Sequence, residues 1–152
     1  MNEMLVALRL PDVTPQFGPR PSVNEWGMLP VGHPIWLWTD GPRTRSASVA
    51  SQGVTFRLSA TWVSMRFSMG DGVTVTCTSM SKYTDAVVPG TRSPSCGHVY
   101  SMPSLPKGDY AVTATATWRI NWSAAGVSGS FRHAYSDTAQ LPIGELQGLI
   151  VR

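Results

Sequence analysis

Two cysteines and a neighbouring histidine offer the first candidate chemistry in this sequence. Cys77 and Cys96 can form a disulfide bond, which would close a loop and stabilise the fold by about 3 kcal/mol. Their thiolates could instead bind zinc, together with His98 and a second histidine. The spacing lacks the Cys-x-x-Cys knuckle typical of structural zinc sites, which weighs against zinc.

An acidic corner, Gly70-Asp71-Gly72, directly precedes the alternating run VTVTC. Its two glycines can adopt positive φ, and the carboxylate of Asp71 can accept hydrogen bonds from nearby backbone N–H groups. A calcium site would need roughly six or more oxygen ligands. Asp85 is the other carboxylate near in sequence, so we predict a structural hairpin corner and no metal site.

The three histidines, His33, His98 and His133, are candidates for acid–base chemistry. A Ser-His-Asp triad is a spatial arrangement, so its members need no fixed sequence spacing. The sequence has no Gly-x-Ser-x-Gly elbow, no glycine-rich phosphate loop and no His-Glu-x-x-His motif. We therefore expect a protein that is not an enzyme and needs no cofactor, and we expect His98 to order a turn.

Six tryptophans could build a platform for a sugar, because flat rings stack on the apolar faces of carbohydrates. Trp118 and Trp122 share a strand face with Val112 and Ala116, which favours packing in the core. Trp26, Trp36 and Trp38 lie near a proline-rich segment, and we take them as the aromatic residues that could be exposed to a ligand.

Composition limits the function classes further. The chain has 152 residues, typical of one domain, and 14% of them are charged, against an average of about 25%. The net charge is +3, but the basic residues are scattered, so no nucleic-acid-binding stripe is apparent. No segment has the roughly 18 apolar residues of a membrane span. The start MNEMLVALRL lacks the basic region and cleavage site of a signal peptide.

Alternation of apolar and polar residues predicts an all-β fold. In YAVTATATWRINW every even position from Tyr110 to Trp122 is apolar, so one face of this strand is buried. Further strands, separated by Gly-containing or Pro-containing breaks, are predicted at ASVAS, VTFRLSATW, SMRFS, VTVTCTS and HVYSM. The segment AAGVSGS predicts a turn, and residues 131–152 predict one or two closing strands. Many short strands without intervening helices are typical of a sandwich or barrel.

Residues 1–43 differ from the rest, so we divide the chain into this N-terminal arm and a domain at 44–152. MLVALRL predicts a strand with Val6, Leu8 and Leu10 on one side. The following segment carries six of the twelve prolines, which restrict the backbone to extended conformations. We expect this arm to pack on the domain.

The segments FSMGDGVTVT and HVYSMPSLPKGDYAVTATATW together resemble the PKD domain, an immunoglobulin-like β-sandwich. That family's pattern is an aromatic residue, Gly-Asp-Gly, a strand, His-x-Tyr, a glycine turn and Tyr-x-Val. The matching residues here are Phe67, Gly70, Asp71, Gly72, His98, Tyr100, Gly108, Tyr110 and Val112. The resemblance covers about half of the chain and implies contacts with proteins or carbohydrates. An insert from about 80 to 95 departs from the pattern.

More narrowly, the whole chain resembles a group of uncharacterised exported proteins from high-GC Gram-positive bacteria. The shared features are Trp36-Leu37-Trp38, the two cysteines, Trp118 with Trp122, and Glu145 to Gln147. This resemblance implies an extracellular or cell-envelope location. In an exported protein two cysteines tend to pair, so we predict a Cys77–Cys96 disulfide.

These observations predict a non-catalytic, exported binding or structural module of the bacterial envelope or of a surface assembly. Its expected partner is another protein, contacted at exposed sheet edges. The alternative is a carbohydrate-binding module for cell-wall polysaccharide, which would use exposed tryptophans. A small hydrolase would need a histidine within about 3.5 Å of a serine or carboxylate in a pocket.

Overall fold

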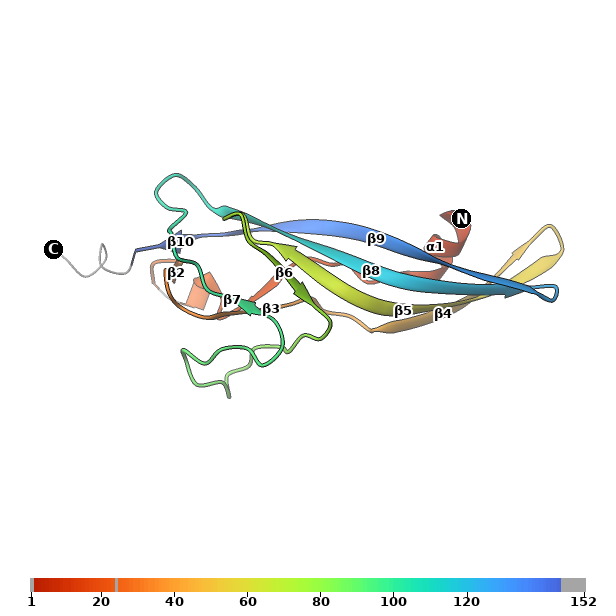
Figure 1. Cartoon of the computed structure of the whole chain (residues 1–152), viewed down its shortest axis with the longest axis horizontal. Helices are drawn as coiled ribbons and strands as arrows, with labels where there is room; N and C mark the ends of the chain where they lie inside the picture. The colour runs from red at the N-terminus through yellow and green to blue at the C-terminus, as the bar shows by residue number, and fades with distance from the viewer. Residues whose placement is uncertain (1, 24, 146–152) are drawn as a thin grey trace.

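The computed structural model describes residues 2–23 and 25–145, and these residues form an elongated, all-β structure (Figure 1). Its main element is a twisted antiparallel sheet with the strand order β4-β5-β8-β9, in which β6 also pairs with the C-terminal part of β5. These strands are β4 (Thr44–Ser51), β5 (Val54–Ser68), β6 (Thr74–Cys77), β8 (Tyr110–Ala124) and β9 (Val127–Leu141).

The segments VTFRLSATW and SMRFS, expected as two strands, form the single strand β5. A β-bulge at Val63 interrupts its pairing with β8 between Trp62 and Ser64. The bulge changes which residues face the core, because Leu58 and Ala60 are buried before it and Met65 and Phe67 after it. The shift from even to odd apolar positions in the sequence is therefore the mark of the bulge.

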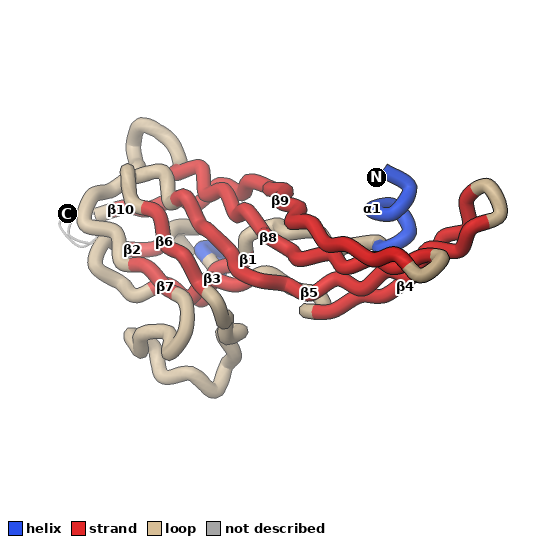
Figure 2. Tube along the Cα trace, turned by 45° about the vertical axis from the view of Figure 1, so that its right-hand side comes forward, coloured by secondary structure: helices blue, strands red, loops and turns tan. Residues whose placement is uncertain are grey.

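A second, smaller sheet faces this one and closes the sandwich-like core (Figure 2). Its antiparallel strands are β1 (Gln16–Gly18), β3 (Ile35–Trp38) and β7 (Gly97–His98). A parallel pair, β2 (Leu29–Pro30) with β10 (Ile143–Gly144), and a 3₁₀ turn at Pro21–Val23 complete the described elements. The proline-rich arm thus supplies β1, β2 and β3, and its residues share one hydrophobic core with the rest of the chain.

The start of the chain is a helix, so the predicted strand over MLVALRL is wrong. Helix α1 spans Asn2–Leu8, buries Leu8 and leaves Val6 74% exposed. Met, Leu and Ala are strong helix formers, and Met4, Leu5 and Leu8 fall on one helical face. The helix ends at Leu8, because the next residue, Arg9, has a positive φ of 51° that does not continue the helix. It packs against β4 and β5.

No helix in the described ranges combines the length and apolar character that crossing a bilayer would need.

Two long hairpins carry the large sheet beyond the area that the small sheet covers. β4–β5 turns at Gln52-Gly53 and β8–β9 turns at Ala125-Gly126, and all four turn residues have positive φ. Two-residue turns of this kind match the twist of the strands, so the pairing continues to the tips. The turn expected over AAGVSGS therefore involves two residues only. We call the part of the sheet at 47–58 and 120–131 the hairpin end; it lies at the right of Figure 1.

Candidate functional site

The Gly-Asp-Gly corner predicted from the sequence links the large sheet to the small one. Asp71 Oδ1 accepts a hydrogen bond of 3.0 Å from the Val73 backbone N–H, as predicted. Asp71 Oδ2 lies 2.8 Å from Nε2 of His98, on β7, and both side chains are mostly buried. Gly70 is required here, because its φ is +83° and a Cβ would lie 3.0 Å from the Ala111 carbonyl oxygen.

Two tyrosines complete this corner. The buried Tyr100 hydroxyl donates a 2.8 Å hydrogen bond to the Met69 carbonyl oxygen. The Tyr100 ring stacks on Tyr110 at 4.4 Å between centroids and meets the edge of the His98 ring at 4.6 Å. The structure therefore brings together all six residues of the predicted turn motif: Gly70, Asp71, Gly72, His98, Tyr100 and Tyr110.

The electrostatics of the corner favour neutral tyrosines. Burial, reinforced by the Asp71 carboxylate, raises the pKa of Tyr100 far above its ordinary value. The same two causes, burial first, raise the pKa of Tyr110. Both phenols therefore stay protonated and act as donors, Tyr100 to Met69 and Tyr110 to the Met102 carbonyl oxygen at 2.7 Å. The Asp71–His98 contact thus joins the turn after β5 to β7.

We expect the Asp71–His98 contact to be energetically coupled. Asp71→Ala and His98→Ala should each lower the free energy of unfolding by about 1–3 kcal/mol, because each leaves a mostly buried partner group without its hydrogen bond. The double variant should then cost less than the sum, with a coupling of about 1 kcal/mol. Urea unfolding of the four proteins measures this, and Asp85→Ala, in an exposed loop, serves as the control. Additive losses would contradict a direct bond.

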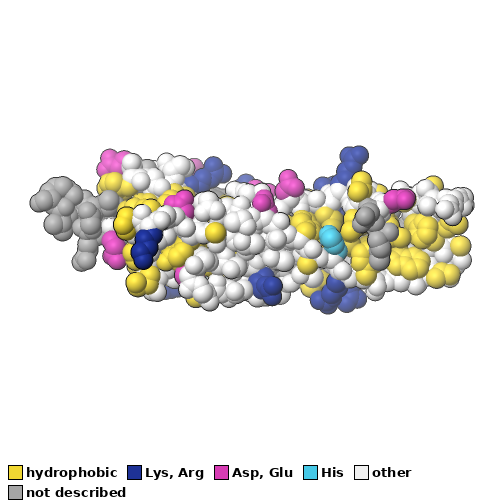
Figure 3. Space-filling model, turned by 90° about the horizontal axis from the view of Figure 1, so that it is seen from above, with side chains coloured by type: hydrophobic (Ala, Val, Ile, Leu, Met, Phe, Trp, Pro, Cys, Tyr) yellow, Lys and Arg dark blue, Asp and Glu magenta, His cyan; other side chains and the backbone are white. Residues whose placement is uncertain are grey.

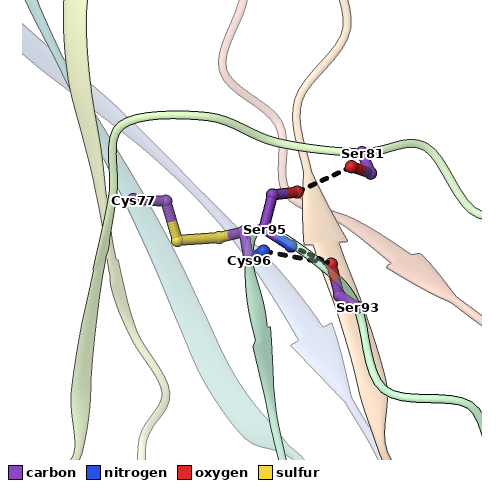
Figure 4. The surroundings of a disulfide bond; sticks show 5 residues. All are labelled: Cys77, Ser81, Ser93, Ser95 and Cys96. Carbon is purple, nitrogen blue, oxygen red and sulfur yellow. Dashed lines mark hydrogen bonds between the residues drawn. A yellow bond between two sulfur atoms is a disulfide. The ribbon is translucent and has the colours of Figure 1, made fainter.

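The predicted disulfide is confirmed: Cys77 at the end of β6 is bonded to Cys96 just before β7, across a sequence separation of 19 (Figure 4). Because both thiols are used in this bond, the zinc alternative fails. Serines order the loop beside it. Ser81 and Ser95 share a 2.7 Å hydrogen bond, and the Ser93 hydroxyl accepts bonds from the Ser95 and Cys96 backbone N–H groups.

The loop that the disulfide closes folds back over the small sheet. Trp36, on β3, donates a 2.8 Å hydrogen bond to the Thr91 carbonyl oxygen and packs edge-on against Tyr83. Between this loop and the arm lies a cleft of about 660 Å³. Its walls are apolar at Phe17, Trp38 and Tyr83, with Arg20, Lys82 and Asp85 also among the lining residues.

The expectation that Trp36 and Trp38 are exposed to a ligand is wrong. They are 7% and 5% exposed, because one face of β3 meets the large sheet while β1 and the 78–96 loop cover the rest. Trp26, at 50% exposure, is the member of the predicted set that reaches the surface. Exposed, coplanar tryptophans are therefore not assembled near the proline-rich segment.

The hairpin end carries an aromatic cluster on the face of the large sheet that also contacts α1 and the small sheet, which we call the inner face. Phe56 and Trp122 lie 6.1 Å apart between ring centroids, and Phe131 is on the neighbouring strand. All three are only partly buried. Nearer the tips, Val127 is 59% exposed. Hydrophobic side chains gather toward this end in Figure 3.

The opposite, outer face of the large sheet is polar. On β8 it carries Thr113, Thr115, Thr117, Arg119 and Asn121. A shallow hollow of about 560 Å³ lies on the hairpin end, and hydroxyls of Ser59, Ser123, Ser128 and Ser130 are among its lining residues. This face contains no aromatic ring along β8, in contrast to the inner face.

Sequence reasoning missed the hairpin end as a surface. The signal was the length of the alternating runs: β5, β8 and β9 each have 15 residues, whereas β3 has 4. Strands that long cannot be covered by so short a facing sheet, so part of their apolar face must be left open.

No group of three or more His, Cys, Asp or Glu residues arranged to hold a metal ion occurs in the part of the chain that the structure describes. Comparison of the sequence and structure with protein-family models, curated proteins and solved structures found no match.

Proposed function

We propose that this chain is a non-catalytic, exported binding module of the bacterial envelope, and that it contacts another protein through the inner face of its hairpin end. The observation that carries the proposal is the partly exposed cluster of Phe56, Trp122 and Phe131 on strands that project beyond the small sheet.

The disulfide supports export. Structural disulfides form and persist in oxidising compartments outside the cytoplasm and are rare inside it. The Cys77–Cys96 bond ties β6 to the segment before β7 and closes a serine-rich loop, which is a structural use of the pair.

The composition of the hairpin end supports protein binding. Aromatic residues supply much of the binding energy in protein interfaces, and contiguous exposed apolar surface marks interaction sites. Phe56 and Trp122 belong to different hairpins that are paired along β5–β8, so a partner would meet a preformed surface. Val54 and Val127, which lie nearer the tips of the hairpins, extend this apolar area.

The carbohydrate alternative is less well supported. It relied on Trp26, Trp36 and Trp38 as exposed rings, and Trp36 and Trp38 are buried. One exposed ring does not form the stacking platform that the alternative requires.

A photocrosslinking experiment tests the proposal. A photoreactive phenylalanine analogue is placed at Phe56, on the inner face, or at Thr55, the adjacent outer-face position of the same strand. Each protein is expressed with a secretion signal in a high-GC Gram-positive host and irradiated on intact cells. We expect a protein adduct from position 56 that is at least about tenfold more abundant than from position 55.

The outcomes are distinct. Adducts to a second protein at position 56, lost when Trp122→Ser is added, support the proposal. Equal crosslinking from both positions, or crosslinking to glycan alone, would overturn it. Thermal unfolding of each variant confirms that the hairpin end is folded.

A further inference from the structure

The outer edge of β9 has no neighbouring strand in the part of the chain that the structure describes. β9 is the last strand in the order β4-β5-β8-β9 and pairs with β8 along its full length, from Val127 to Leu141. Protein sheets protect such edges with proline, charged side chains, bulges or short strands. β9 contains neither proline nor lysine and has no bulge against β8, and its formally charged side chains are Arg132 and Asp137. Its edge is therefore open to another strand.

The inner face of β9 is also incompletely covered. On β8 the inner residues Val112, Ala114, Ala116, Trp118 and Ile120 are all fully buried. The residues directly beside them on β9, including Phe131, Tyr135 and Ala139, are only partly buried. A further strand at this edge would cover these side chains.

We propose that a second copy of this chain pairs with β9, antiparallel and with the two copies of Tyr135 directly opposite each other. His133 then lies opposite the second copy's Asp137, and Phe131 lies opposite the second copy's Ala139. The pairing would run from Gly129 to Leu141 on both strands. It joins two four-strand paths into one continuous sheet related by a two-fold axis.

Face and charge favour one register. In an antiparallel pair, directly opposite residues lie on the same face, so two identical strands must pair odd positions with odd positions. Registers centred on Arg132, His133 or Asp137 would place identical ionisable side chains opposite each other. The register centred on Tyr135 instead places an imidazole opposite a carboxylate, twice, by symmetry.

Most groups on and under β9 are compatible with this pairing, but the Thr138 backbone N–H, which donates to Asp137 Oδ1, would have to turn to the second copy's Arg132 carbonyl oxygen. Asp137 Oδ2 accepts a 2.6 Å hydrogen bond from Thr14, and Oδ1 accepts one from the Thr138 backbone N–H. These bonds lower the pKa of Asp137, so it stays ionised, and each oxygen retains capacity for a further donor. The Tyr135 hydroxyl donates to the Pro11 carbonyl oxygen, which keeps the arm on the inner face. On the outer face, Ala134 would lie opposite the second copy's Ser136.

Pairing at this edge goes beyond the proposed function and does not require it. The two hairpin ends would point in opposite directions from the two-fold axis, so the assembly would be bivalent for any partner of the hairpin end. Two linked sites gain effective concentration when both are engaged.

A charge-swap series tests the pairing by sedimentation velocity over a wide range of protein concentration. We expect a reversible dimer for the wild type. His133→Asp should weaken it by about tenfold or more, because carboxylates would then face each other. Adding Asp137→His to His133→Asp should restore the dimer, since the opposite pair is re-formed in reverse. Circular dichroism and thermal unfolding check that each variant is folded.

Disulfide trapping tests the register. The chain's two cysteines are bonded to each other, so new cysteines can be placed without other free thiols. Ala134→Cys and Ser136→Cys proteins, mixed before oxidation, should give a covalent heterodimer, whereas each alone should crosslink several-fold less. A monomer at every concentration, or trapping independent of position, would overturn the proposal. Photocrosslinking from position 56 to another protein would be unaffected by that failure, so the two proposals fail separately.

Discussion

Reduction of the Cys77–Cys96 disulfide is expected to lower the free energy of unfolding by about 3 kcal/mol. The bond closes a loop of sequence separation 19, and chain-entropy models give this value for loops of that size. Because Trp36 bonds to Thr91 inside the same loop, part of the small sheet should also loosen. Urea unfolding with and without reductant measures the change.

The matched control for this result is the Cys77→Ala/Cys96→Ala variant, which should show the same loss and no further response to reductant. A loss below about 1 kcal/mol would mean that the Ser81–Ser95 and Ser93 bonds hold the loop without the disulfide. A reductant effect on the double-alanine variant would show that the reagent, rather than the bond, causes the change.

Truncation of Trp118, the largest fully buried side chain among the described residues, is expected to destabilise the protein severely. Trp118 is 1% exposed, lies opposite Trp62 on β5 and is next to His133 on β9. Trp118→Ala should lower the free energy of unfolding by about 3–5 kcal/mol, since it removes a large buried side chain and leaves a cavity. Differential scanning calorimetry should show a fall of about 10 °C or more in Tm.

Two variants on the same strand complete that test. Trp118→Phe keeps an aromatic ring and should cost less than the alanine variant. Thr117→Ala, on the outer face, should change the stability by about 0.5 kcal/mol or less. Equal losses from Trp118→Ala and Thr117→Ala would contradict the assignment of an inner and an outer face to β8.

The strand that could be predicted best from the sequence is β8. Alternation with period two is a local property, and seven consecutive even apolar positions left one interpretation. The structure buries Val112 through Ile120 on the predicted face and extends the strand to Ala124. The all-β fold class followed from this and similar runs.

The N-terminal helix could not be predicted in the same way. In a segment as short as MLVALRL, leucines satisfy both a helical face and a strand face, so periodicity does not decide. The outcome depends on where the segment packs, here against β4 and β5. That neighbour is more than thirty residues away in sequence, and no local pattern reveals it.

The contacts of the Gly-Asp-Gly corner could be predicted from the sequence, whereas the burial of Trp36 and Trp38 could not. Asp71, His98 and Tyr100 were grouped because a family pattern orders them, and the structure does bring them into contact. The exposure of Trp36 and Trp38 depends on what covers each face of β3. Tyr83 lies against Gly18 and packs edge-on against Trp36, and it comes from an insert whose path has no sequence signature.

The two-residue turns at Gln52-Gly53 and Ala125-Gly126 also bear on how the chain loses conformational freedom. Hairpin strands are adjacent in sequence, so closing them costs little loop entropy. The small sheet instead joins residues 16–18 to 36–38, and residues 35–36 to 97–98, through much longer loops. Most of the loop-closure entropy that folding costs is therefore lost when the small sheet forms on the large one. Because closing the hairpins costs little entropy, they can extend beyond the small sheet without a sheet to cover them.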